Sequence, residues 1–252
     1  MQLFCVKPKV HCIDTFAAFA AEFALGPRDL LLTETFLYER FIKAAGLSCP
    51  IILKDKYDAG EPKEETVDQI LADMQPFPID RVVAVGGGSV IDTAKAILYF
   101  VWERHKARGE KLEKPCFVAI PSTSGTGSEV TNFSVISAKG AKNVLIDEFI
   151  APDVALLDST CIRNVPKAVI ADTGMDVLVH ALEAYVSKDA TDFTDALAEK
   201  TAELIFAHLK KLYDDPANDN ARDRVQNASC IAGVAFTNAN LGITHSMAHA
   251  LG

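Results

Sequence analysis

The segment from Arg81 to Lys95, RVVAVGGGSVIDTAK, places three consecutive glycines between two stretches of different character. The stretch before the glycines, 82–85, is a run of β-branched and small apolar residues, which is typical of a buried parallel strand. Ser89, a residue type favoured at N-caps, precedes a helical pattern over 90–100. The segment therefore predicts a strand, a tight glycine turn and the start of a helix.

Such a turn has two interpretations. A helix N-terminus directs backbone N–H groups and a positive dipole end toward a bound phosphate, and glycines let that phosphate approach closely because they lack a Cβ atom. A strand-to-helix turn without a ligand has the same signature, so the motif alone leaves both interpretations open.

Strand-like and helical patterns alternate through the first part of the chain, which predicts a parallel, doubly wound α/β sheet. After a short strand-like start, we expect a helix with Asp14 as its N-cap. A hairpin is expected with strands at 133–137 and 143–147. The other predicted strands are 29–34, 50–55, 116–120 and 155–158, and the other predicted helices are 35–45, 63–74 and 89–104.

From Pro166 onward the glycines thin out and strand patterns disappear. Helical patterns cover about 166–187, 194–213, 221–239 and 244 to the end. The sequence therefore predicts an α/β domain over residues 1–163 and an all-α domain over residues 164–252.

The composition excludes several classes of protein. A net charge of −9 and a pI of about 5.2 argue against a nucleic-acid or anionic-membrane surface. No signal peptide or membrane-spanning run is expected, so we predict a cytoplasmic protein. The cysteines are scattered without metal-site spacing and are expected to be buried thiols of a reducing compartment: Cys5, Cys12, Cys49, Cys116, Cys161 and Cys230.

Two further features fit a nucleotide. Glu34 ends an early strand, where an acidic side chain can accept hydrogen bonds from ribose hydroxyls and repel a 2′-phosphate; a surface glutamate at a loop start is the simpler interpretation. The hydroxyl-rich loop 121–128, PSTSGTGS, follows a buried strand and can line a cofactor groove, or it is an ordinary flexible loop.

The helical part carries a possible metal site. Asp176 and His180 are spaced i, i+4, so both project from one helix face among apolar neighbours. His245 and His249 have the same spacing near the start of another helix. Asp and His side chains from two helices form a plausible ligand set for a divalent transition metal, whereas an Asp–His pair alone is more often a hydrogen-bonded core pair.

Four separated motifs together resemble the iron-dependent (group III, metal-containing) alcohol dehydrogenases: GGGSVIDTAKA, PSTSGTGSEVTNFSVI, GMDVLVHALEAYVS and GITHSMAHALG. The resemblance runs in register over nearly the whole chain. The segments LLLTETFLYERF and KYDAGEP look most like the 4-hydroxybutyrate dehydrogenase branch.

This resemblance implies a dinucleotide-binding domain followed by a helical metal-binding domain. It implies metal ligation by Asp176, His180 and His245, and a proton-relaying role for His249 near the nicotinamide. It also implies NAD binding; the residues expected to contact the cofactor are Glu34, Gly86, Gly87, Gly88, Ser89, Asp92, Ser122, Thr123, Thr126 and Lys142. The family pattern continues past Gly252 to a Pro-His-Gly motif that carries a fourth ligand, so we expect the helical domain to be incomplete here.

The activity expected from the resemblance is hydride transfer between NAD(H) and a short-chain primary alcohol or aldehyde, with 4-hydroxybutyrate and succinate semialdehyde as the first choice. The expected metal is Fe²⁺, with Zn²⁺ as the alternative. Small-molecule substrates and a homo-oligomer are expected, without nucleic-acid or membrane partners. The alternatives are a general alcohol or diol dehydrogenase, a glycerol-phosphate dehydrogenase or sugar-phosphate cyclase relative, and a nucleotide-binding remnant without metal.

Overall fold

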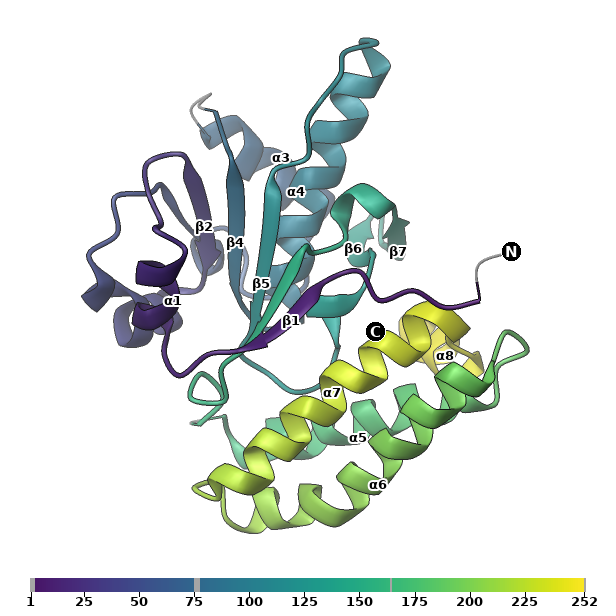
Figure 1. The fold of residues 1–252 in the computed structure, drawn as a ribbon. Helices are drawn as coiled ribbons and strands as arrows, with labels where there is room; N and C mark the ends of the chain where they lie inside the picture. Colours follow the sequence, from purple (N-terminus) through teal and green to yellow (C-terminus); the bar gives the residue numbers. More distant parts are fainter. Residues whose placement is uncertain (1–2, 75–77, 164, 252) are drawn as a thin grey trace. The chain divides into compact units, whose positions relative to one another are not determined.

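The computed structural model describes residues 3–74, 78–163 and 165–251. It divides into two compact units (Figure 1). The sheet unit comprises Pro8–Pro121 and Asn132–Asp158, and the helical unit comprises Met1–Lys7, Ser122–Thr131 and Ser159–Gly252. The helical unit thus includes the hydroxyl-rich loop as well as the region predicted to be helical. Asn164, at the predicted domain boundary, lies outside the described residues.

A six-stranded parallel sheet forms the centre of the sheet unit, as the alternating patterns predicted. Its strand order is β1-β8-β5-β4-β2-β3. The strands are β1 (Lys9–Cys12), β2 (Asp29–Thr33), β3 (Ile51–Leu53), β4 (Arg81–Gly86), β5 (Cys116–Pro121) and β8 (Val154–Leu157). The predicted hairpin is also confirmed, with β6 (Phe133–Ala138) and β7 (Ala141–Ile146) paired antiparallel.

The sheet has an apolar layer on each face because successive side chains of a strand point to opposite sides. Leu30 and Leu32 pack in one cluster, with residues of α3 (Glu64–Asp73) and α4 (Gly88–Ala107). Leu31 packs in the other cluster, with residues of α1 (Phe16–Glu22). Buried on both faces, these strands read as continuous apolar runs rather than as an alternating pattern.

Three local predictions were wrong. Helix α1 is capped by Thr15, whose hydroxyl accepts from Ala18 N, and not by Asp14. Helix α4 begins at Gly88 with Gly87 as its N-cap, so Ser89 is already inside the helix. The expected helix over 35–45 is divided into α2 (Thr35–Leu37), a π-helical turn (Tyr38–Ile42) and a 3₁₀ turn (Lys43–Ala45).

Short 3₁₀ turns at Lys54–Lys56, Ser128–Val130 and Glu148–Ile150 complete the connections. The cysteine prediction is only partly right, because Cys12 and Cys116 are exposed, whereas Cys49, Cys161 and Cys230 are buried and Cys5 is half-buried. No helix among the described residues is both long and apolar enough to cross a lipid bilayer.

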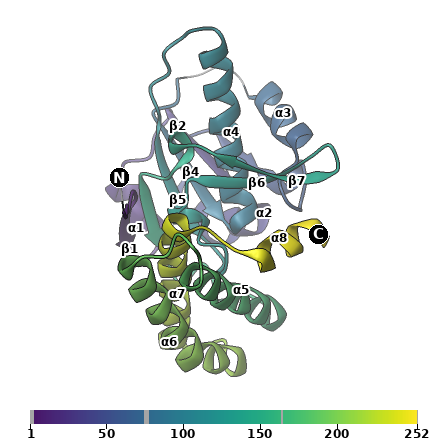
Figure 2. The same cartoon turned by 90° about the vertical axis from the view of Figure 1, so that its right-hand side faces the viewer.

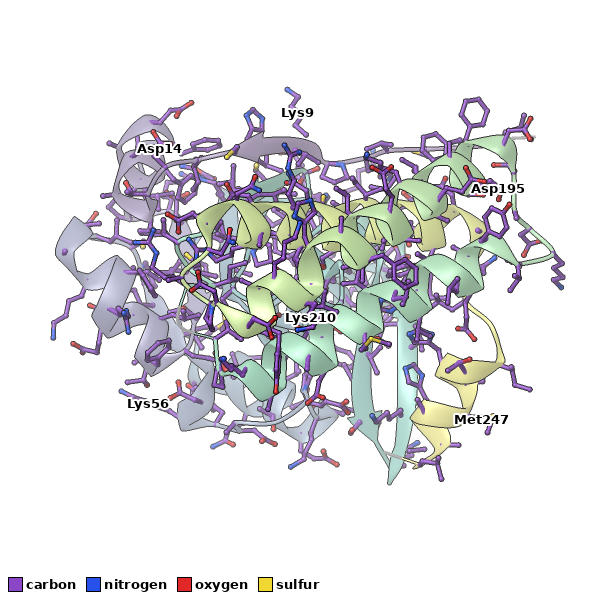
Figure 3. All side chains as sticks on the ribbon, turned by 90° about the horizontal axis from the view of Figure 1, so that it is seen from below. Lys9, Asp14, Lys56, Asp195, Lys210 and Met247 are labelled. Carbon is purple, nitrogen blue, oxygen red and sulfur yellow. The ribbon has the colours of Figure 1, made fainter. Side chains whose placement is uncertain are left out.

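The helical unit contains three long helices that pack along one another, α5 (Lys167–Tyr185), α6 (Asp192–Asp214) and α7 (Asp219–Ala239) (Figure 2). Their shared core is aliphatic and includes Val177, Leu204 and Val225. The short helix α8 (Ile243–Leu251) follows α7 and contains no buried residue; Met247, labelled in Figure 3, is 58% exposed.

Close backbone contacts hold the hydroxyl-rich loop in the helical unit. Gly127, with φ +60°, lies so near Gly233 of α7 that a Cβ on Gly127 would be 2.7 Å from the Gly233 Cα. A Cβ on Gly125 would be 2.8 Å from the Thr173 Cβ on α5. Glycine is therefore required at both loop positions, Gly125 and Gly127, because a larger side chain would separate the loop from the helices.

Candidate metal centre and nucleotide site

Asp176, His180 and His245 lie together in the helical unit. Each offers one ligand atom, and these atoms all lie within 4.8 Å of one another. The Asp176 carboxylate is central, with Oδ2 3.8 Å from Nδ1 of His180 and Oδ1 3.5 Å from Nε2 of His245. The i, i+4 spacing on α5 supplies the first pair, and α8 supplies the third side chain.

The surroundings of His180 favour a neutral ring. The side chain is 6% exposed, and its ring stacks between Phe236 and His245 with 4.4 Å between centroids on each side. Burial lowers the pKa of His180 to about 4, although the Asp176 charge opposes this shift. A neutral imidazole presents a lone pair, which is the form that binds a metal.

One nitrogen of His180 tests whether the site suits a metal. In the part of the chain that the structure describes, the buried Nδ1 atom has no hydrogen-bond partner. A buried polar atom without a partner is costly and uncommon. A divalent cation between Nδ1 and its Asp176 neighbour would satisfy this atom, so the residues fit the metal that the motif predicts.

His245 is held by two carboxylates. Its Nδ1 atom lies 2.6 Å from Glu183 Oε2, while Nε2 faces Asp176. Burial lowers the pKa of His245, but hydrogen bonds to Asp176 and Glu183 outweigh burial and leave the pKa raised. Burial acts in the opposite direction on the Glu183 carboxyl and raises its pKa. The hydrogen bonds that Glu183 accepts, of which the one from His245 is the largest cause, overcome this effect and bring the pKa to about 2.

The sequence prediction did not include Glu183, although a signal for it was present. Glu183 lies seven residues after Asp176, and this spacing returns to the same face of a helix after two turns. His249, the proposed proton carrier, lies one turn after His245, is half-buried and is not part of the three-residue cluster. Two of the apolar residues that follow His180 on α5, Leu182 and Tyr185, are 50% and 44% exposed, so the apolar surroundings expected for the site are only partly formed by its own helix.

The sheet unit brings Glu34 and the glycine turn to one edge. Strands β2 and β4 are parallel neighbours, with Leu32 opposite Ala84. Glu34 lies two residues after Leu32, and Gly86 lies two residues after Ala84. Both residues are therefore at the carboxyl edge of the sheet, where α/β sheets bind ligands. Burial raises the pKa of Glu34, partly opposed by the charge of Lys54.

The glycine turn is sterically tight. A Cβ on Gly86 would lie 2.5 Å from the Val90 Cβ in the first turn of α4. Gly87, Gly88 and Ser89 are half-buried, and the N-cap residue of α4, Gly87, has no side chain with which to cap the helix. A helix N-terminus without such a cap keeps backbone donors for an anion.

Asp92 and Lys142 make contacts within the sheet unit. The Asp92 Oδ2 atom accepts a hydrogen bond of 2.9 Å from Val135 N, and the Ser134 hydroxyl donates to the Asp92 carbonyl. The Lys142 Nζ atom forms an ion pair of 2.9 Å with Glu61. These contacts connect the β6–β7 hairpin to α4 and to the loop before α3.

The hydroxyl-rich loop supplies three of the residues expected to contact the cofactor, and all three belong to the helical unit. Ser122 is buried and Thr123 is half-buried. Thr126 is exposed, and its hydroxyl accepts a hydrogen bond from Ser128 N at 3.2 Å. Their role at a cofactor stays a prediction.

Known proteins resemble this chain over three quarters of its length or more. The 1-propanol dehydrogenase PduQ of Citrobacter freundii is 49% identical over 194 residues, covering 76% of this chain and 51% of that protein. The 4-hydroxybutyrate dehydrogenase of Clostridium kluyveri is 33% identical over 263 aligned positions, covering 100% of this chain and 70% of that protein. The chain thus spans about half the length of the first relative.

A solved structure shares the fold. The sulfoacetaldehyde reductase of Bifidobacterium kashiwanohense, determined in complex with NAD⁺, superposes with a TM-score of 0.82 at 27% identity and covers 96% of this chain and 69% of that one. The family model for iron-containing alcohol dehydrogenases matches residues 9–159. The model for the C-terminal part of the Fe-containing alcohol dehydrogenase family matches residues 170–252. The chain belongs to the iron-containing alcohol dehydrogenase family.

Proposed function

We propose that the protein is a metal-dependent oxidoreductase that transfers a hydride between NAD(H) and a short-chain primary alcohol or aldehyde. The observation that carries this proposal is the cluster of Asp176, His180 and His245, in which a buried imidazole nitrogen has no protein partner among the described residues. In a structural Asp–His pair, this nitrogen would form a hydrogen bond with the carboxylate. A nitrogen that binds a metal has no such protein partner.

The ligand set suits a catalytic metal. Asp176 supplies one negative charge and the two imidazoles supply neutral donors, which leaves coordination positions for a substrate. When bound, a divalent metal supplies Lewis-acid polarisation of a substrate oxygen. Iron is the metal that names the family; zinc is the alternative, because an Asp and His set accepts both.

The cofactor assignment rests on the edge of the sheet. The turn from Gly86 to Ser89 would hold the pyrophosphate, and Glu34 would accept hydrogen bonds from the adenosine ribose. Asp92, Ser122, Thr123, Thr126 and Lys142 complete the proposed set. The carboxylate of Glu34 favours NAD over NADP because it repels a 2′-phosphate.

His249 is the proposed proton carrier. It is half-buried on α8, one turn after the ligand His245. Imidazole exchanges protons near neutral pH, so this ring can pass a proton between the substrate oxygen and water.

The proposed substrates are 4-hydroxybutyrate and succinate semialdehyde, because a 4-hydroxybutyrate dehydrogenase aligns with the whole chain. The competing proposal is a general short-chain alcohol or diol dehydrogenase, favoured by the higher identity to a 1-propanol dehydrogenase. A sugar-phosphate substrate has less support, because it requires clustered basic side chains. Lys167 is directed to the Asp214 carbonyl, 3.1 Å away, and lies over the Tyr213 ring.

Steady-state kinetics with NAD⁺ and added Fe²⁺ tests the proposed function. A hydroxy-acid enzyme should show a much higher kcat/KM for 4-hydroxybutyrate than for 1-butanol, because butanol would leave a buried carboxylate-binding group unpaired. Equal values would support the general alcohol dehydrogenase. No NAD-linked oxidation of any alcohol in the presence of metal would reject both.

The assembly and location of the protein are also proposals. We propose a homo-oligomer in the cytoplasm, acting on small molecules without nucleic-acid or membrane partners; the acidic charge supports the last point. Sedimentation of the full-length protein tests the oligomeric state.

A further inference from the structure

The Glu183 carboxylate connects the end of α5 to the beginning of α8. Its Oε1 atom accepts a hydrogen bond of 2.6 Å from Thr244 N. Its Oε2 atom accepts one of 2.9 Å from Gly242 N and contacts Nδ1 of His245 at 2.6 Å. The side chain is 9% exposed. An ionised carboxylate has enough lone pairs to accept all three bonds, so every donor in this contact is satisfied.

This contact determines which nitrogen of His245 carries the proton. A carboxylate only accepts, and each ring nitrogen faces one. When the ring is neutral, its single proton therefore lies on Nδ1, 2.6 Å from Glu183, rather than on Nε2, 3.5 Å from Asp176, and the lone pair stays on Nε2. The Nε2 atom is the one that faces Asp176, at 3.5 Å. Glu183 therefore presents the lone pair of His245 to the ligand cluster.

The same carboxylate positions α8. The amides of Gly242 and Thr244 lie at the N-terminal end of this nine-residue helix, where backbone N–H groups lack partners within the helix. A helix this short is unstable on its own, and α8 contains no buried residue that could anchor it by packing. The hydrogen bonds from its N-terminal end to Glu183 therefore hold His245 in place, together with the stacking of the His245 ring on His180.

Gly242 makes room for this arrangement. A Cβ at this position would lie 2.9 Å from the Glu183 Oε1 atom and 3.2 Å from its carboxyl carbon. Any larger residue would displace the carboxylate from the helix start. A small change at Gly242 therefore offers a second way to disturb the contact without removing its charge.

We propose that Glu183 is a positioning residue that sets both the tautomer and the location of His245. The proposal rests on the proposed function in one respect, because the Nε2 lone pair has a use only if the cluster binds a metal. Glu183 has no assigned contact with a substrate or a cofactor; it acts through His245. Carboxylates that orient ligand imidazoles in this way typically change metal affinity by about 10- to 100-fold when they are altered.

The test uses the full-length protein with Glu183→Gln, and Glu203→Gln as the control. Glu203 is a glutamate of α6 whose side chain is 67% exposed and paired with Lys200, so the control removes the same charge from the surface of the same unit. A glutamine has one carbonyl oxygen and cannot accept from Thr244, Gly242 and His245 together. If its amide group faces the ring, the ring proton must move to Nε2.

Two readouts are needed. The first is the His245 tautomer in the metal-free protein, read from long-range ¹H–¹⁵N NMR at a pH where the ring is neutral. The second is the Kd for Co²⁺, followed through the visible absorption of the bound ion. We expect Nδ1–H in the wild type and in the control, loss of that state in Glu183→Gln, and Co²⁺ affinity about 10- to 100-fold weaker in Glu183→Gln alone.

The outcomes separate this inference from the proposed function. Wild-type tautomer and wild-type Co²⁺ affinity in Glu183→Gln would overturn the role of Glu183. If the wild type binds no Co²⁺, the proposed function fails, and the tautomer comparison alone decides the positioning role. If Glu183→Gln does not fold, Gly242→Ala decides: weaker Co²⁺ binding supports the inference, and unchanged binding overturns it.

Discussion

Asp176 Oδ1 and His245 Nε2 lie 3.5 Å apart, although the two residues belong to α5 and α8 and the long helices α6 and α7 separate them in the chain. The ligand cluster therefore exists only when the bundle is folded and α8 is in place. Metal binding at such a site is coupled to folding, because the unfolded chain does not present the three ligand atoms together.

The contact between Gly127 and Gly233 should be sensitive to a single methyl group. Gly127→Ala adds left-handed backbone strain of about 1–2 kcal/mol and overpacking of about 1–3 kcal/mol against α7. Gly46→Ala is the matched control, since Gly46 has the same φ of +60° but nothing within 4 Å of its Cβ position. Urea denaturation should show a larger loss of unfolding free energy for Gly127→Ala; equal losses would argue against the tight contact.

The cofactor preference should depend on Glu34. At about 4 Å, its carboxylate repels a 2′-phosphate by about 1 kcal/mol in water, or about fivefold in binding, and by more in a groove. We expect the wild type to prefer NADH, and Glu34→Gln to raise kcat/KM for NADPH. The control is Glu39→Gln, at an exposed glutamate paired with Lys43. A wild type that uses NADPH as well as NADH would contradict the role of Glu34.

Glu34 should also make stability depend on pH. Burial raises its pKa above the ordinary value of 4.5, so the folded state binds the proton more tightly than the unfolded state. Its contribution is therefore most favourable below the ordinary pKa and is lost as the pH rises through the folded pKa. Glu34→Gln should exceed the wild type in unfolding free energy at about pH 7, with a smaller gap at about pH 4. A gap that widens toward acid would contradict the burial effect.

The Asp92 carboxylate should stabilise the β6–β7 hairpin. Asp92→Ala leaves Val135 N without its acceptor, at a cost of about 1–3 kcal/mol. Hydrogen exchange measured by mass spectrometry should become faster in peptides covering 133–146. Asp68→Ala, at an exposed aspartate paired with Arg104, is the control. Unchanged exchange together with weaker NADH binding would instead favour the cofactor role predicted from the sequence.

Regular elements were predictable because their signals are local. The buried strands β4 and β5 read as apolar runs, and their predicted ends lie within one residue of those observed. The exceptions lie where several local signals compete. Ser89 has the better capping side chain, but the backbone enters the helix at Gly88, which leaves the amides of the glycine turn at the helix start.

Tertiary contacts were less accessible to sequence analysis. The i, i+4 spacing placed Asp176 and His180 together, but nothing local indicated that Glu183 would meet the amides of a helix far along the chain. The loop at 122–131 likewise packs with α7 because of Gly127 and Gly233, and a contact between two glycines has no sequence pattern of its own. The i, i+4 spacing alone left the metal ligands undecided. The resemblance to the iron-dependent alcohol dehydrogenases selected Asp176, His180 and His245.

The metal content of His180→Ala, measured on the full-length protein beside the wild type, tests whether Asp176, His180 and His245 hold a catalytic metal ion. The ligand cluster lies in the helical unit, whereas Glu34 and the glycine turn lie in the sheet unit. We therefore predict that the wild type retains one metal ion per chain and that His180→Ala loses both the metal and the activity, while its NADH affinity stays unchanged. An active, metal-replete His180→Ala protein would contradict the account.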